Sequence, residues 1–239
     1  MKIVMEEAWL QTRRLKRHLF LEAERVKLNL QGRRPGFKVF CVGRGKTGTT
    51  SMEAALRGLG FLMGDEIELR YRHFLYWADR NFEPILRYCA RYDAFQDLPF
   101  SAQDTFRYMD DGLPESKFIL TVRGSSEEWY DSAVRYQIKR LGTGGSLPDR
   151  KALERAPDLR RGWTLRITEF YGTTPESPFD RDLAIAGYEA HNAAVKAHFR
   201  NRPDDLLVLN VAEPGSYGRM LDFLGMTSSE REFPWLNKT

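Results

Sequence analysis

Cysteine is scarce in this chain, which limits how the fold can be cross-linked. Only two cysteines, Cys41 and Cys89, occur among 239 residues, and they are far apart. Neither belongs to a spacing typical of a disulfide framework or a metal site. A disulfide scaffold is therefore excluded as the fold class, and no metal is expected. Both cysteines fall in segments predicted to be buried, where a thiol acts as a small hydrophobic side chain.

Long apolar runs, repeats and linker-like tracts are also missing. No segment approaches the ~20 apolar residues of a membrane-spanning helix. The N-terminus lacks an apolar signal-peptide core with a cleavage site, so we expect a cytoplasmic protein. No Pro/Gly/Ser-rich tract divides the chain, and its length suffices for one sizeable core. We expect a single domain over residues 35–239, preceded by an arm over 1–34.

Positive charge is concentrated in that arm. Residues 1–34 hold nine Lys and Arg against four Glu, a net charge of +5, so the rest of the chain carries about −1 of the overall +4. Apolar residues between Trp9 and Phe20 interleave with these cations, which predicts a basic amphipathic helix. Packing on the domain or oligomerisation is the ordinary role of such a helix, and peripheral membrane contact is the alternative. Nucleic acid is not expected as a partner, because no basic patch with interleaved aromatics recurs later.

The strongest signal is an apolar strand that leads through a glycine-rich loop into a helix. Residues 38–60 read KVFCVGRGKTGTTSMEAALRGLG. The N–H groups of a helix's first turn carry partial positive charge and bind anions, and the Lys46 ammonium would join them. The segment therefore predicts a site for a phosphate-like oxyanion. The residues expected to hold it are Arg44, Gly45, Lys46, Thr47, Gly48, Thr49, Thr50 and Ser51.

This loop departs from the nucleotide triphosphatase pattern GxxxxGK[ST], because Phe40 stands where the first glycine would be. The segment GKTGTTSM resembles instead the 5′-phosphosulfate loop of the sulfotransferases. That resemblance implies an α/β, P-loop-NTPase-like three-layer fold with a central parallel sheet flanked by helices. It also implies 3′-phosphoadenosine 5′-phosphosulfate (PAPS) as the sulfonyl donor and 3′-phosphoadenosine 5′-phosphate (PAP) as the product.

A second strand end agrees with the same family. Residues 117–123, KFILTVR, form an apolar segment that ends in Arg123, and a helical pattern follows. Sulfotransferases place an arginine here and a serine about two turns on, both on the 3′-phosphate of PAPS, which are the positions of Arg123 and Ser132. Arg123 and Ser132 are nine positions apart, whereas family members usually have one position fewer between the arginine and the serine. Segments from Tyr188 to the C-terminus are similar as well, so the resemblance spans about 38–239.

The acceptor site is expected at the carboxyl ends of the next strands, where parallel sheets gather their ligands. Residues 64–74, GDEIELRYRHF, are loosely similar to a segment that holds the catalytic glutamate of glycan sulfotransferases. Glu66 and Glu68 are the candidate general bases, with Glu68 slightly favoured, and His73 and Asp65 lie behind them. A base there would contribute about two to four orders of magnitude in rate. A charged, solvated loop is an equally ordinary interpretation of this segment.

Three further expectations complete the prediction. Asp97, at the exit of a strand, would position the acceptor together with Asp65, or would hold Mg²⁺ if the protein were a kinase. Residues 141–180 have the composition of a lid or acceptor-recognition insert. Parallel strands are expected near 38–42, 60–63, 93–97, 117–122 and 206–211.

We therefore predict a PAPS-dependent sulfotransferase without a metal, in which Lys46 stabilises charge on the bridging oxygen. A carbohydrate, a lipid and another small molecule all remain open as the acceptor. One alternative is an ATP-dependent small-molecule kinase, and a second is a non-catalytic nucleotide-binding module whose arm docks a partner or a membrane. The missing glycine argues against the kinase, and the loop beside candidate bases argues against the passive module.

Overall fold

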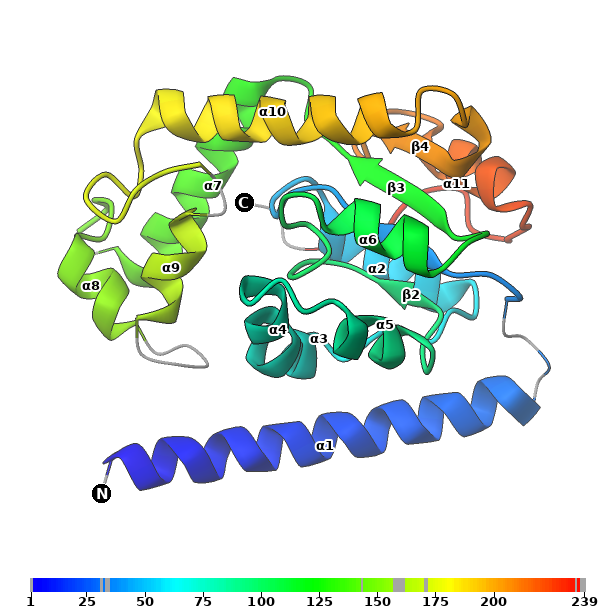
Figure 1. The fold of residues 1–239 in the computed structure, drawn as a ribbon, viewed down its shortest axis with the longest axis horizontal. Coiled ribbons are helices and arrows are strands. Elements are labelled where there is room, and N and C mark those ends of the chain that lie inside the picture. Colours follow the sequence, from blue (N-terminus) through cyan, green and yellow to red (C-terminus); the bar gives the residue numbers. More distant parts are fainter. Residues whose placement is uncertain are drawn as a thin grey trace.

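A parallel β-sheet lies at the centre of the molecule (Figure 1). The computed structural model describes residues 2–30, 32, 35–142, 144–156, 162–169, 172–234 and 236. The strands are β1 (Val39–Cys41), β2 (Ala94–Phe95), β3 (Lys117–Thr121) and β4 (Leu206–Leu209), in the order β2-β1-β3-β4. All three pairings are parallel. The expected α/β class with a parallel sheet is confirmed.

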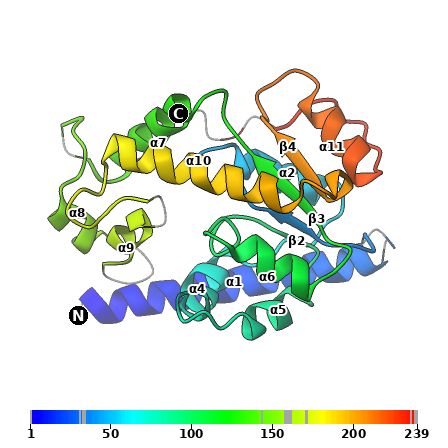
Figure 2. The ribbon, with the colours of Figure 1, turned by 45° about the horizontal axis from the view of Figure 1, so that its top comes forward.

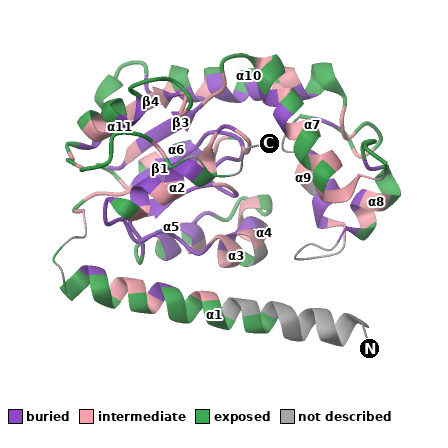
Figure 3. Cartoon of the chain, turned by 180° about the vertical axis from the view of Figure 1, so that it is seen from behind, coloured by how far each residue is buried: buried purple, intermediate pink, exposed green. Residues whose placement is uncertain are grey.

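Helices cover both faces of the sheet, which explains why its strands are almost wholly apolar. Side chains alternate between the faces along each strand, so Phe40 packs with Phe95 and Phe118 on one face, whereas Val39 and Cys41 pack on the other. The first face is covered from α5 (Glu83–Cys89), α6 (Thr105–Gly112) and α10 (Arg181–His198). The second is covered from α2 (Thr49–Gly58) and α11 (Ser216–Leu224). Figure 3 shows the buried strands between these layers.

The predicted strand over 60–63 is wrong as a regular strand. Only Met63 forms a bridge, with Ala94, at the sheet edge beyond β2. The Leu62 N–H donates to the Asp93 side chain at 3.0 Å, and the Leu62 carbonyl accepts from the backbone N–H groups of Asp93 and Ala94. The Leu62 N–H thus donates to a side-chain carboxylate, whereas in a regular strand it would donate to a backbone carbonyl of the neighbouring strand.

A set of short helices connects this edge to the site. They are α3 (Glu66–Glu68), the π-helix η1 (Leu69–His73) and α4 (Phe74–Ala78). The short 3₁₀-helix η2 (Pro203–Asp205) leads into β4. Beside the sheet, α7 (Ser126–Leu141), α8 (Arg150–Arg155) and α9 (Trp163–Glu169) gather at one end of the molecule (Figures 1 and 2). The prediction that residues 141–180 act as a lid stays a prediction.

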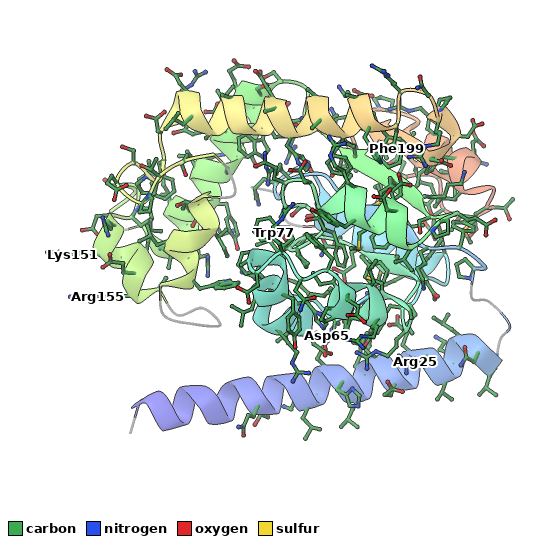
Figure 4. The ribbon with its side chains drawn as sticks, viewed as in Figure 1. Arg25, Asp65, Trp77, Lys151, Arg155 and Phe199 are labelled. Atoms are coloured by element: carbon green, nitrogen blue, oxygen red, sulfur yellow. The ribbon has the colours of Figure 1, made fainter. Side chains whose placement is uncertain are left out.

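The N-terminal arm is helical, as its pattern predicts. Helix α1 (Lys2–Leu30) runs along one side of the domain (Figure 1). Leu21 and Leu28 are buried against the domain core, and Arg25, labelled in Figure 4, donates to the Arg91 carbonyl at 3.4 Å. Leu19 on another part of the helix is exposed. No helix in the described ranges combines the length and apolar character needed to cross a bilayer.

Candidate functional site

Two glycines give the loop after β1 its tight shape. A Cβ on Gly43 would lie 2.1 Å from Thr121 Oγ1 and 2.5 Å from the Thr121 carbonyl oxygen, so no side chain fits there. Gly48 has φ of +94°, and its Cβ would lie 2.2 Å from a methyl group of Val211. Lys46 itself adopts φ of 74°, a conformation that costs an L-residue about 1–2 kcal/mol. The loop is therefore a strained backbone turn that the surrounding contacts hold in place.

Hydrogen bonds fix three successive carbonyl groups of this loop. The Arg44 carbonyl accepts from the Thr47 hydroxyl at 2.6 Å, and the Gly45 carbonyl accepts from Trp129 Nε1 at 3.0 Å. The Lys46 carbonyl accepts from Arg123 Nε at 2.7 Å. Because the N–H of a trans peptide points opposite to its C=O, the N–H groups of these peptide units turn the other way, as in anion-binding nests.

The loop forms one wall of a cleft of about 440 Å³. The first turn of α2 follows directly, and the first-turn N–H groups of a helix point out of its end. Arg123, at the end of β3, lines the same cleft. The predicted donor residues that line it are Gly45, Lys46, Gly48, Thr49, Thr50, Ser51 and Arg123.

Positive charge accumulates around Lys46. Its Nζ lies 4.4 Å from the centre of the Tyr136 ring, a cation–π contact. Burial lowers the pKa of the Lys46 ammonium, and the neighbouring cations Arg123, Lys139 and Arg135 lower it further. An anion bound here would relieve this repulsion, so the end of the cleft at Lys46 is suited to a negatively charged ligand.

Three predicted donor residues are outside the described lining of this cleft. Thr47 is fully buried, and its hydroxyl also contacts Thr121 Oγ1 at 2.6 Å, which ties the loop to β3. Arg44 is buried and donates to the Ser101 carbonyl at 3.0 Å. Ser132 on α7 is only 1% exposed, and its hydroxyl has no hydrogen-bond partner in the part of the chain that the structure describes.

The two candidate glutamates point to different surroundings. Glu66 lines the cleft, with 42% of its side-chain surface accessible, and lies 3.6 Å from Arg70. The cleft walls still displace much of its water, so burial raises the pKa of Glu66, and the Asp97 carboxylate raises it further. Glu68 lies 3.8 Å from both His73 and Arg91, and the neighbouring His73 ring is the main cause of its lowered pKa.

The other residues of that segment have packing and capping roles. The His73 ring packs on Tyr88, with ring centres 4.4 Å apart. Asp65, labelled in Figure 4, caps α3 by accepting from the Ile67 and Glu68 N–H groups. Asp65, Glu68 and His73 do not belong to the described lining of the cleft, whereas Asp97 does. Asp97, two residues after the end of β2, has φ of 60°.

A family model described as a sulfotransferase domain matches residues 38–239. The chain belongs to this family. No curated protein matches it significantly. The matched region of this sulfotransferase starts one residue before β1, so α1 lies outside it.

Sequence reasoning missed several residues that line the cleft of this sulfotransferase. Glu53 stands four residues after Thr49 on α2, a helical spacing that puts both on one face and could have been noticed. Gln96 directly precedes Asp97, so the same strand-end argument applied to it. Others from α7 and η1 carried no local signal. The missed residues are Glu53, Arg70, Gln96, Tyr136, Gln137 and Arg140.

Proposed function

We propose that this sulfotransferase moves a sulfonyl group from PAPS to a hydroxyl or amine of a carbohydrate, lipid or other small-molecule acceptor. One observation carries the proposal. The loop cation Lys46, the strand-end cation Arg123 and the first turn of α2 line the same cleft as a carboxylate with a raised pKa, Glu66. A donor with several negative charges and an acceptor that must lose a proton need these two kinds of group side by side.

The donor end follows from the loop. Residues 45–51 would bind the 5′-phosphosulfate through backbone N–H groups and hydroxyls, as at other helix N-termini. Arg123 would hold the 3′-phosphate, and Ser132 is the second residue proposed for this phosphate. The buried Ser132 hydroxyl without a partner is the kind of group that a bound ligand or a water satisfies. PAPS supplies the activated sulfonyl group.

The acceptor side of the cleft contains the proposed general base, Glu66. Glu66 accepts the proton of the acceptor hydroxyl while the acceptor oxygen bonds to sulfur. The sulfur–oxygen bond to the 5′-phosphate breaks, and its electron pair stays with the PAP oxygen, where Lys46 offsets the new negative charge. We assign the base to Glu66 instead of Glu68 because Glu66 lines the cleft and because its raised pKa makes it the stronger base.

Ligand-dependent melting tests the donor. PAP at a hundredfold its dissociation constant stabilises a protein by about 2.7 kcal/mol, which corresponds to a shift of roughly 5–10 °C for a domain of this size. ADP, which lacks the 3′-phosphate, should give a clearly smaller shift. Arg123→Ala should remove the difference between the two nucleotides. A shift with ATP and Mg²⁺ but none with PAP would refute the proposal and favour the kinase.

A further inference from the structure

The end of the cleft away from Lys46 presents hydrogen-bond acceptors and a net negative charge. We infer that the acceptor carries a protonated amine in addition to the group that is sulfonated, and that Gln96 and Asp97 bind this amine. This inference rests on the proposed function, because it specifies the acceptor class for the same cleft. It follows from the orientation of Gln96, from the unpaired Asp97 and from the balance of charges around Glu66.

Gln96 lines the cleft, and its buried carbonyl oxygen lacks a hydrogen-bond partner among the described residues. Its Nε2 donates to Glu53 Oε2 at 3.0 Å. A carboxylate can only accept, so the amide must turn its nitrogen toward Glu53 and its oxygen away. Gln96 is 9% exposed and lines the cleft, and its Oε1 has no hydrogen-bond partner among the described residues. A buried amide oxygen in this state requires a donor from a ligand or a water.

Asp97 adds a carboxylate without a counter-ion. It also lines the cleft, and the described ranges provide no ion pair or side-chain hydrogen bond for it. Its charge reaches Glu66, since it is the second cause of the raised pKa there. A ligand that brings a positive charge to Asp97 would relieve this repulsion.

The other carboxylates at this end already have partners. Glu53 Oε1 accepts from Arg57 at 2.9 and 3.0 Å and lies 3.6 Å from Arg17. Glu66 lies 3.6 Å from Arg70. Glu24 shares Arg57 with Glu53. With Asp97, these four carboxylates face three arginines, so one negative charge is left at this end of the cleft. The cations that affect Lys46 belong to α7 and the end of β3. An anionic acceptor would be repelled here, and a neutral one would leave Asp97 without compensation.

Helix α1 supports this wall from outside the family region. Arg17 and Glu24 on α1 contact Glu53 and Arg57 on α2, and Arg57 in turn holds Glu53. These ion pairs saturate one Glu53 oxygen, so the other is left for Gln96. The arm thus contacts Glu53, the residue that holds the Gln96 amide.

Two sets of matched compounds test the inference independently of the acceptor skeleton. The hexose set is glucosamine, glucose and glucuronate, and the phenol set is tyramine, p-cresol and 4-hydroxyphenylacetate. Each set holds a cationic, a neutral and an anionic member. With the PAP complex, the cationic member should raise the melting temperature most, and with PAPS it should give a kcat/KM at least about tenfold above the neutral member, as for one charge-assisted hydrogen bond. Equal responses within both sets, no binding of either amine, or a preference for an anion would overturn the inference.

Asp97→Asn tests the same point on the protein. Asn tolerates the left-handed backbone and keeps the shape of the side chain, so the variant should bind PAP normally and lose the cationic preference. Asp104→Asn is the matched control, because Asp104 has a similar φ of 61° but lies outside the described cleft lining and near Arg107. An unchanged preference in Asp97→Asn would refute the assignment. If the unaltered protein did not bind PAP, the proposed function itself would be refuted.

Discussion

Replacing Glu66 by Gln should remove most of the turnover and leave donor binding intact. The substitution keeps the shape of the side chain and its place in the cleft but deletes the group that accepts a proton. General-base catalysis contributes about 10²- to 10⁴-fold, which is roughly 3–5 kcal/mol of the activation barrier. Turnover should be measured with saturating PAPS, and PAP binding should be measured by the shift in melting temperature.

The pH dependence provides a second readout of the same substitution. Burial and Asp97 raise the pKa of Glu66, so the fraction of ionised base, and with it kcat/KM, should fall as the pH drops through this raised value. The Gln variant should lack that limb. Because the folded protein disfavours the ionised form, Glu66 lowers stability once the pH exceeds its ordinary range. The Gln variant should therefore melt no lower than the unaltered protein at neutral pH.

Glu68→Gln is the matched control, with the opposite expected outcome. The pKa of Glu68 is lowered, mainly by the neighbouring His73, so its charge stabilises the fold above the ordinary carboxyl pKa and that contribution is lost as the pH falls. Glu68→Gln should lower the melting temperature at neutral pH while turnover stays within a few-fold. If Glu68→Gln abolished turnover and Glu66→Gln did not, the assignment of the base would be wrong.

Three other substitutions probe the loop and the core. Lys46→Ala should reduce turnover by about two to three orders of magnitude, as for the loss of one preorganised charge-stabilising donor, and near-normal rates would contradict its role. Gly48→Ala forces a side chain toward Val211 at φ of +94° and should lower stability by about 1–2 kcal/mol, whereas a neutral effect would mean that the loop is not held as described. Burial, with a contribution from Arg44, lowers the pKa of His191 to about 3. Stability should then fall below about pH 6.5 by up to roughly 1.4 kcal/mol per pH unit from this group, and His191→Gln should remove that part of the slope in denaturation at pH 7 and pH 5.

The strand, loop and helix between β1 and α2 could be predicted because their signals are local. A run of apolar residues, glycines at fixed positions and a helical pattern follow one another between Val39 and Gly60. The structure adds the reason for two of the glycines, which is contact with Thr121 and with Val211. Those contacts come from distant parts of the chain, yet they leave a trace in the sequence because only glycine satisfies them.

The surroundings of Glu66 and Glu68 could not be predicted in the same way. Glu66 and Glu68 stand two residues apart, and the cap by Asp65 that starts α3 turns them to different sides. The expected strand over 60–63 failed because the Asp93 side chain takes over a ladder contact from 31 residues away. The helical arm was predicted from its pattern, but its ion pairs with α2 depend on tertiary packing that no sequence spacing reveals.

The left-handed backbone at Asp97 has a consequence for how this enzyme could diversify. Asp, Asn and Gly all tolerate that conformation far better than other residues do, so folding requires a certain backbone at position 97 and not a carboxylate. A lineage could exchange Asp for Asn or Gly there with little effect on the sheet or the donor loop. With the acceptor role inferred above for Asp97, acceptor preference could change through this one residue while Lys46 and Glu66 stay the same.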